Sequence, residues 1–198
     1  MQPSQPAPPV DDAAAARAVI AVDASLRTAF MQISGKDHAA AARTIQAARD
    51  QAGDDPDLHA RIDRWGLFND YAKEFAKHAA DALKAANAGR DYALGKTRIA
   101  VIESTPTMLI YKQAGTVHRV PRERIPHDVI TAIVGTWFAA DGRAANHIFL
   151  GIHHLAQPQP DVAATRREWQ TATNGGESMA GMMPLLDDPI IKGAARGR

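Results

Sequence analysis

The sequence predicts an α+β protein, mostly helical, in which a small antiparallel β meander separates two helical units. Alanine-rich runs with apolar residues three or four positions apart are typical of amphipathic helices. The β-branched stretch TRIAVIE, residues 97–103, interrupts this pattern and is typical of a strand. Glycine and proline cluster where one pattern gives way to the next. At 198 residues, the chain has room for one domain or for two small ones.

The N-terminal helical unit is expected over residues 12–88, after a disordered, proline-rich tail over residues 1–11. Turn signals at residues 34–37 (SGKD) and 53–56 (GDDP) divide this unit into three helices. Short turns between consecutive helices favour an antiparallel bundle or an array of helical hairpins.

The meander is expected over residues 89–125, with three strands at residues 97–103, 107–112 and 116–121. Residues 92–94 are a candidate for an additional short edge strand. A sheet this small is stable only when it packs against another element, and the neighbouring helices are the obvious partner.

Helical patterns return over residues 126–187, where we expect four helices, the last of them short. Trp65, Trp137 and Trp169 each fall on an apolar helical stripe and are predicted to lie in the core. Residues 188–198 carry glycine and arginine and are predicted to form a disordered tail.

The composition excludes several classes of site. Cysteine is absent, which excludes disulfides, thiolate metal sites and cysteine nucleophiles. The net charge of +1 gives no overall attraction to nucleic acid or to a membrane surface. No stretch approaches the roughly 20 apolar residues that cross a bilayer, and the N-terminus MQPSQPAPPV lacks the basic and apolar regions of a signal peptide. We therefore expect a soluble protein, with the cytoplasm as the favoured compartment.

The stretch GRDYALGKT, residues 89–97, resembles a phosphate-binding loop because it ends in Gly-Lys-Thr. Five residues separate its glycines, whereas four are needed for the backbone amides to converge on one phosphate. A helix precedes the stretch and a strand follows it, so no helix N-terminus faces the lysine. We interpret the stretch as a helix C-cap at Gly89 and a turn at Gly95.

Three histidines lie in the helical segment NHIFLGIHHLAQ, residues 146–157. His147 and His154 are seven positions apart, whereas a helical zinc pair has a spacing of four. Both lie opposite the apolar face of the predicted helix, and His153 lies on its flank. We predict solvated or interfacial histidines here, with a metal or acid–base role as the alternative.

A basic turn, HRVPRER at residues 118–124, places Arg119, Arg122 and Arg124 close together in the sequence. Three arginines at the edge of a meander can contact phosphates. Glu123 interrupts the cluster, however, and no aromatic residue lies within it. A solvated turn with local ion pairs is therefore favoured over a nucleic-acid site.

The triplet Gly176-Glu177-Ser178 is similar to the start of a nucleophile elbow. No strand is predicted before it, and no histidine follows it in the chain. We therefore expect Ser178 to cap a short helix over residues 179–186.

A further pattern spans residues 94–187. The strands TRIAVIE and TMLIYKQAGTVHRV lead through RERIP into helical segments that contain TWF, LGIHHLA and ATRREWQTA, and a Gly-Gly turn and PLLDD follow. This arrangement resembles a module of uncharacterised bacterial proteins of planctomycete type, whose helices are similar to tetratricopeptide-like hairpins. The resemblance implies stacked helical hairpins and supplies no catalytic residues. A repeat period of about 34 residues is not visible.

Because each catalytic pattern fails in spacing, order or context, we predict a non-enzymatic protein-interaction or scaffold module that needs no cofactor. Its partner is expected to be another protein, and the oligomeric state stays open. The candidate interaction residues are Arg119, Arg122, Arg124, His147 and His154.

Two alternatives remain. The first is a metal-dependent hydrolase that uses scattered histidines such as His118, His127 and His153. The second is a weak nucleic-acid binder that acts through the turn from Arg119 to Arg124.

Overall fold

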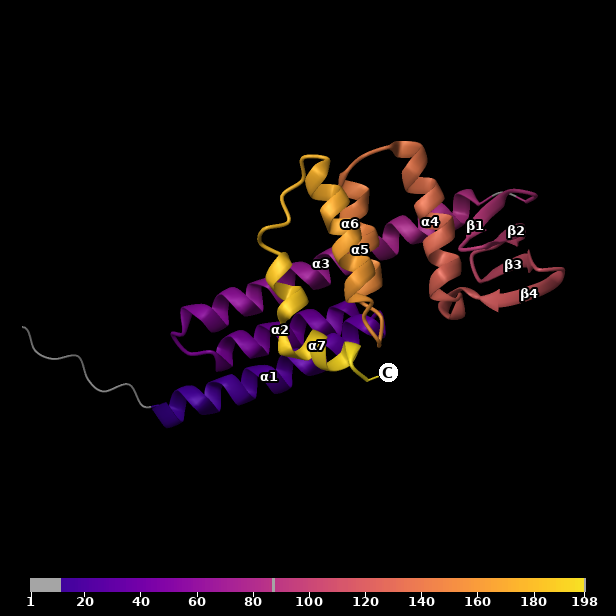
Figure 1. Cartoon of the computed structure of the whole chain (residues 1–198). Coiled ribbons are helices and arrows are strands. Elements are labelled where there is room, and N and C mark those ends of the chain that lie inside the picture. Colours follow the sequence, from indigo (N-terminus) through magenta and orange to yellow (C-terminus); the bar gives the residue numbers. More distant parts are fainter. Residues whose placement is uncertain (1–11, 87, 198) are drawn as a thin grey trace, which may run out of the picture. The chain divides into compact units, whose positions relative to one another are not determined.

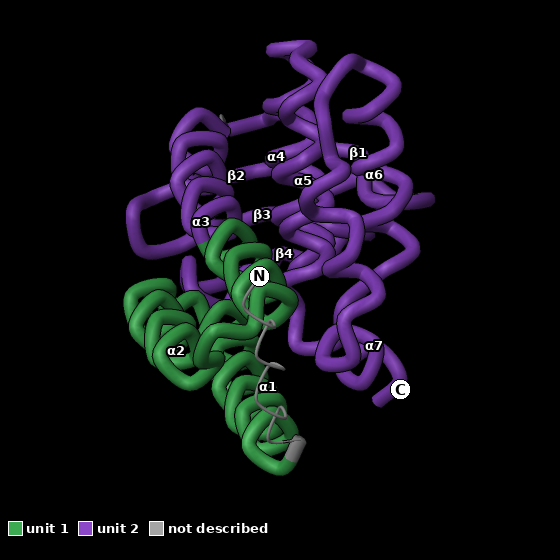
Figure 2. The backbone as a smooth tube through the Cα atoms, turned by 90° about the vertical axis from the view of Figure 1, so that its left-hand side faces the viewer, with its two compact units in different colours: residues 1–69 green, residues 70–198 purple. Residues whose placement is uncertain are grey.

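The computed structural model describes residues 12–86 and 88–197, so the predicted tail over residues 1–11 lies outside the described part. The described chain is mostly helical with one small antiparallel sheet, which confirms the predicted α+β class (Figure 1). The chain divides into two compact units, Met1–Asn69 and Asp70–Arg198 (Figure 2).

The division lies inside helix α3, Pro56–Ala85, whereas the sequence placed the first boundary after residue 88. The difference has a physical cause. Phe75, Ala79 and Leu83, on the second half of α3, are buried in the same hydrophobic cluster as the sheet. The end of this helix therefore belongs to the unit that contains the strands.

Unit 1 contains α1 (Asp12–Ser34), α2 (His38–Gln51) and the first part of α3. Short carboxylate side chains start two of these helices. Asp37 accepts a hydrogen bond from the Ala40 N–H at the start of α2, and Asp55 accepts one from the Leu58 N–H at the start of α3. Such caps satisfy N–H groups that have no partner within the helix.

Trp65 is fully buried in unit 1, as predicted, and lies edge-on to two other rings. Its ring centroid is 6.2 Å from that of Phe30 on α1 and 5.8 Å from that of Phe68. Nearby, the buried Asn69 side chain donates to the His38 carbonyl at 3.1 Å, and its Oδ1 lies 3.1 Å from His38 Nδ1. This amide ties the first residue of α2 to α3.

The sheet belongs to unit 2 and consists of β1 (Asp91–Leu94), β2 (Thr97–Ser104), β3 (Met108–Gln113) and β4 (Thr116–Pro121). The strands are antiparallel and lie in sequence order, so β1 and β4 are the edges. Three strands were predicted, and the fourth is the candidate edge strand.

The predicted turn at Gly95 is confirmed, whereas the predicted helix C-cap at Gly89 is wrong, because α3 ends at Ala85 and the Gly89 N–H donates to the Val101 carbonyl of β2. Gly89 has φ of +80° and Gly95 has φ of +57°, conformations that favour glycine. Leu94 pairs with Thr97 across the two-residue turn of a hairpin. The stretch thus contains β1 and the turn into β2, and it does not lead into a helix as a phosphate-binding loop does.

Helix α4 (His127–Asp141) follows the 3-10 turn η1 (Arg122–Arg124) and packs against the sheet (Figure 1). The residues that α4 buries share one hydrophobic cluster with the inner face of the strands. They are Val129, Ile130, Ile133, Val134 and Phe138 from α4, and Tyr92, Ile99, Val101, Leu109 and Tyr111 from the sheet. This packing supplies the support that so small a sheet needs.

Helices α5 (Ala145–Leu155) and α6 (Val162–Asn174) form a close pair in unit 2. Trp169 of α6 is fully buried, and its indole N–H donates to the Ile148 carbonyl of α5 at 3.2 Å. The Thr165 hydroxyl donates to the Gly151 carbonyl at 3.1 Å. A Cβ at Gly151 would overlap Nε1 and Cδ1 of Trp169, so the glycine permits this approach. Trp137, by contrast, is only partly buried.

Two predictions for the C-terminal end are wrong. The segment after the Gly-Gly turn forms a 3-10 helix, η2 (Met183–Asp187), in place of a helix over residues 179–186. The predicted disordered tail over residues 188–198 contains helix α7 (Pro189–Ala195). Asp188 caps α7 by accepting from the Ile190 N–H, and Ile190 and Ile191 are buried, which anchors a helix too short to be stable alone.

Replacement of Gly151 by alanine is expected to destabilise unit 2 by about 1–3 kcal/mol, because the added methyl group cannot be accommodated beside the Trp169 indole. Urea denaturation followed by circular dichroism and tryptophan fluorescence measures the change. Gly135→Ala on α4 is the matched control, since a Cβ there meets no atom within 4 Å. That variant is expected to be at least as stable as the wild type. Equal stability of the two variants would contradict the proposed role of Gly151.

Candidate functional site

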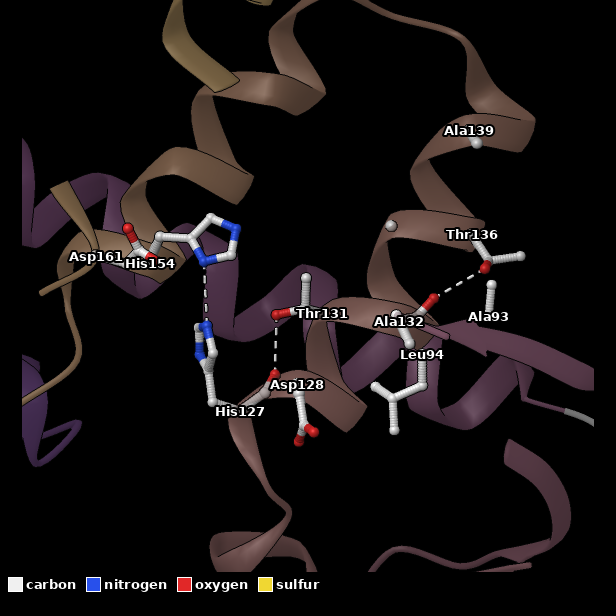
Figure 3. A pocket seen from close by; sticks show the side chains of 12 residues that line it. Ala93, Leu94, His127, Asp128, Thr131, Ala132, Thr136, Ala139, His154 and Asp161 are labelled. Carbon is white, nitrogen blue, oxygen red and sulfur yellow. Dashed lines mark hydrogen bonds between the residues drawn. The ribbon is translucent and has the colours of Figure 1, made fainter. Parts of the chain in front are cut away.

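A pocket of about 530 Å³ lies in unit 2 beside the exposed face of α4 (Figure 3). Its volume is within the roughly 300–1,000 Å³ range of small-ligand sites. Three elements supply its walls: α4, the end of β1, and the segment at the end of α5 and the start of α6. The lining residues are Ala93, Leu94, Gly95, His127, Asp128, Thr131, Ala132, Gly135, Thr136, Ala139, His154 and Asp161.

The floor of the pocket is the side of α4 that does not face the sheet, and its residues are small. A Cβ added at Gly135 would meet no atom within 4 Å, so the space in front of this residue is open. The hydroxyls of Thr131 and Thr136 donate to the carbonyls of His127 and Ala132, at 2.9 and 2.8 Å. These hydroxyls are engaged with their own helix, so the floor presents mainly methyl groups and backbone.

One end of the pocket is formed by a pair of histidines from different helices. Nε2 of His127, the first residue of α4, lies 3.1 Å from Nδ1 of His154 on α5. Figure 3 shows the two rings joined at these atoms, with the second nitrogen of His154 turned toward the space beside α4. The pair thus forms a hydrogen-bonded wall whose outer nitrogen faces the pocket.

The protons of this pair can be assigned from the other nitrogen of His127. Its Nδ1 has no accessible surface and no hydrogen-bond partner. A buried N–H without an acceptor is rarer in proteins than an under-satisfied acceptor. We therefore place the proton of His127 on Nε2, where it is donated to Nδ1 of His154. His154 then carries its own proton on Nε2 and offers an N–H donor to the pocket.

Both imidazoles are uncharged near neutral pH. Burial, with a smaller contribution from His154, lowers the pKa of His127 to about 4, although Asp128 and Asp161 act in the opposite direction. Burial also lowers the pKa of His154, against the effects of Glu168 and Asp161. The free-energy cost of taking the charged imidazolium out of water is larger than the attraction that the nearby carboxylates provide.

A third histidine supports the pair from behind. His153 is only 7% exposed, and its ring stacks on His127 with centroids 4.1 Å apart. His153 also stacks on Phe75 of α3, with ring centroids 4.3 Å apart. The order Phe75, His153, His127 forms a column of rings that holds His127 in place.

The sequence-based prediction for the histidines of α5 is wrong for His153. His153 was expected on a flank of the helix, yet it is buried. His154 is partly buried and lies against His127. The helical wheel assumed one buried face, whereas α5 has buried residues on several sides. His147, the other candidate, pairs with Glu168 of α6 at 2.7 Å and is partly exposed.

Of the histidines named for a metal site, the structure brings together His127 and His153, while His118 stacks on Tyr111 in the sheet at 4.9 Å. Among the described residues, no group of three or more histidines and carboxylates is arranged to hold a metal ion. A metal bound to Nε2 of His127 and Nδ1 of His154 would also force a proton onto the buried Nδ1 of His127. The geometry therefore favours a hydrogen-bonded pair.

The three arginines of the basic turn do not act as one group. Arg122 is partly buried, and its guanidinium donates to the Thr105 carbonyl at 2.7 Å and to the Ser104 hydroxyl at 2.9 Å. It therefore fastens the turn between β2 and β3. Arg119 on β4 and Arg124 in η1 are exposed.

No family model, no curated protein and no solved structure matches the chain. None of the helices in the described residues is both long enough and apolar enough to cross a membrane. What the pocket does must therefore be argued from its own residues.

Acidification is expected to destabilise unit 2 through the histidine pair. The unfolded state binds a proton at His127 near the ordinary pKa of 6.5, and the folded state does so only near about 4. The unfolded state holds more protons between these values, so stability falls as the pH is lowered through this window and is unaffected by this group above it. Urea midpoints measured between about pH 7 and about pH 5 report the slope.

His127→Phe is the matched variant for this experiment. Its ring can still stack on His153, but it has no proton to bind. The midpoint of this variant is expected to fall less steeply with acidification than that of the wild type. Identical slopes would show that the pair does not titrate as described.

Proposed function

We propose that this protein is a non-enzymatic interaction module whose pocket beside α4 receives an extended segment of a partner protein. This proposal rests on the observation that two different elements line the pocket side by side. One is the small-residue face of α4, and the other is the end of an edge strand. A helix face without bulky side chains allows a partner backbone to approach closely.

The geometry of β1 supports an extended occupant. Leu94 and Thr97 are the closing pair of a two-residue hairpin, so their N–H and C=O groups are directed at each other. The neighbouring residue, Ala93, then directs its N–H and C=O away from β2. Ala93 also lines the pocket. An added strand pairs with such groups in many peptide-binding domains.

The histidine wall supplies a second polar contact. With His127 donating to His154, Nε2–H of His154 is a neutral donor on the pocket side. A backbone carbonyl is the natural acceptor for a neutral N–H, because neither group carries a net charge that must be desolvated. Backbone groups from β1 and a donor from α5 together fit a peptide better than an apolar small molecule.

The proposal uses only part of the predicted similarity to tetratricopeptide-like hairpins. The α5–α6 pair is a helical hairpin with a small residue packed against an aromatic one. In this proposal, however, the partner segment is bound beside α4 and β1 and does not occupy a groove built from stacked repeats.

Gly135→Leu is expected to block the pocket without harming the fold, because the new side chain enters open space and leucine favours a helix more than glycine does. A library of random linear peptides displayed on phage and panned against the wild-type protein is expected to yield an enriched sequence pattern. Panning against Gly135→Leu is expected to lose that pattern.

Gly66→Leu on α3 is the matched control, since it also adds leucine at a helical glycine with no atom within 4 Å of the added Cβ. It belongs to unit 1 and is not one of the lining residues, and it is expected to retain the enrichment. Absence of any pattern on the wild type, or a pattern that survives Gly135→Leu, would refute a peptide site in this pocket.

A further inference from the structure

The positive charge of the chain is concentrated in the segment that forms the sheet. Residues 89–125 contain seven lysines and arginines and three aspartates and glutamates, so this segment carries a net charge of +4. The whole chain carries +1, and the remainder therefore carries −3. The near-neutral total is thus the sum of a basic sheet segment and an acidic remainder.

Three of these cations form a diagonal line across the face of the sheet that α4 does not cover. Lys112 of β3 pairs with Ala100 of β2 on one side and with Val117 of β4 on the other. Arg98 and Arg119 are two residues from these partners, so they point to the same face as Lys112. Each is a diagonal neighbour of Lys112, at roughly 7–8 Å. All three cationic side chains are exposed.

Two carboxylates on the same face offset this line only in part. Asp91 lies 3.8 Å from Arg98, in an ion pair between two exposed side chains. Glu103 and Arg119 pair with the same residue of β3 from opposite sides, so a whole strand separates them. Within the described residues, neither Lys112 nor Arg119 has an ion-pair partner. Like charges at neighbouring cross-strand positions repel each other, so an anionic surface laid on this face would stabilise them.

Aliphatic side chains cross the line of cations on this face. Val117 and Ile102 are each 44% exposed. Ile110, which is partly buried, is a diagonal neighbour of Val117 and lies opposite the irregular part of β2 that contains Ile102. These three side chains are therefore contiguous. Contiguous exposed apolar groups mark a surface that contacts a protein or a membrane.

We infer that this face of the sheet binds the surface of an anionic membrane, with Arg98, Lys112 and Arg119 at the lipid phosphates and Ile102 and Val117 among the headgroups. Both kinds of side chain favour this occupant. Cations near an anionic leaflet are attracted to its lipids, and aliphatic groups that enter the headgroup region leave water.

A single-stranded nucleic acid fits this face less well, because its bases bind by stacking on exposed aromatic rings. The four strands, all of which the structure describes, contain three aromatic residues. Tyr92 and Tyr111 are buried on the inner face, and His118 stacks on Tyr111 with ring centroids 4.9 Å apart. None of the three cations lines the pocket beside α4, so the inference does not depend on the proposed function.

The test measures sedimentation of the full-length protein with lipid vesicles. The wild type is expected to sediment with vesicles of equal parts phosphatidylcholine and phosphatidylserine, and to stay in solution with vesicles of phosphatidylcholine alone. Sodium chloride is expected to weaken this binding, because salt screens the attraction between exposed charges. Equal binding to the two kinds of vesicle, or binding to neither, would overturn the inference.

Lys112→Gln and Arg119→Gln each remove one exposed charge and are expected to weaken binding about fivefold. Val117→Thr keeps a β-branched side chain in the strand but removes apolar surface, so it is expected to weaken binding at every salt concentration. Lys73→Gln is the matched control, since it removes an exposed cation of α3 from outside the sheet. It is expected to bind like the wild type, and circular dichroism checks that each variant is folded.

Three further outcomes would contradict the inference. An equal loss of binding in Lys73→Gln and Lys112→Gln would show that binding follows the net charge of the protein and not this face. Unchanged binding of Val117→Thr would show that the aliphatic side chains do not enter the membrane. Binding to single-stranded RNA or to polyglutamate, without binding to the vesicles, would assign the face to a nucleic acid or to an acidic protein.

Discussion

The close contact between Gly151 and the Trp169 indole is the constraint on which the arrangement of unit 2 depends. The glycine has no Cβ, so the indole can lie against the α5 backbone and donate to the Ile148 carbonyl. Residues of α5 on either side of Gly151 then fall in defined places. His147 pairs with α6, and His154 reaches the start of α4. A looser α5–α6 pair would separate the atoms that form the histidine wall.

The second constraint is the shared core of α4 and the sheet. A four-stranded meander with a first strand of four residues is not stable alone, and α4 covers its inner face with branched aliphatic side chains. Once that face of α4 is used, the opposite face is left beside β1 and the end of α5. The small residues on it create the pocket because nothing bulky fills the space.

The ring column of Phe75, His153 and His127 lowers the stability of the folded state at low pH. Two of its members are titratable groups placed where water is scarce, and the pKa of His127 falls to about 4 as a result. The cost appears only when the pH is low enough to charge the unfolded histidine. Near neutral pH, His127 in this column is uncharged.

Local features could be predicted from the sequence because they depend on neighbouring residues. Helix-forming patterns, the positive φ at Gly89 and Gly95, and the β-branched strands all follow from short-range sterics and hydrophobic spacing, and the structure agrees with them. The aspartate-proline start of α7 was also a local signal. The tail was nevertheless predicted to be disordered, because a seven-residue helix has no stability until Ile190 and Ile191 are buried.

The candidate site was decided by tertiary structure. His127 and His154 are distant in the chain, and no spacing rule joins them. A helical wheel treats a helix as having one partner, so it could not foresee that α5 would be buried on several sides and that His153 would become part of the core. The sequence alone therefore determined which segments become helices, strands and turns. Packing between segments decided which side chains meet, because the burial that perturbs a histidine exists only after the helices have come together.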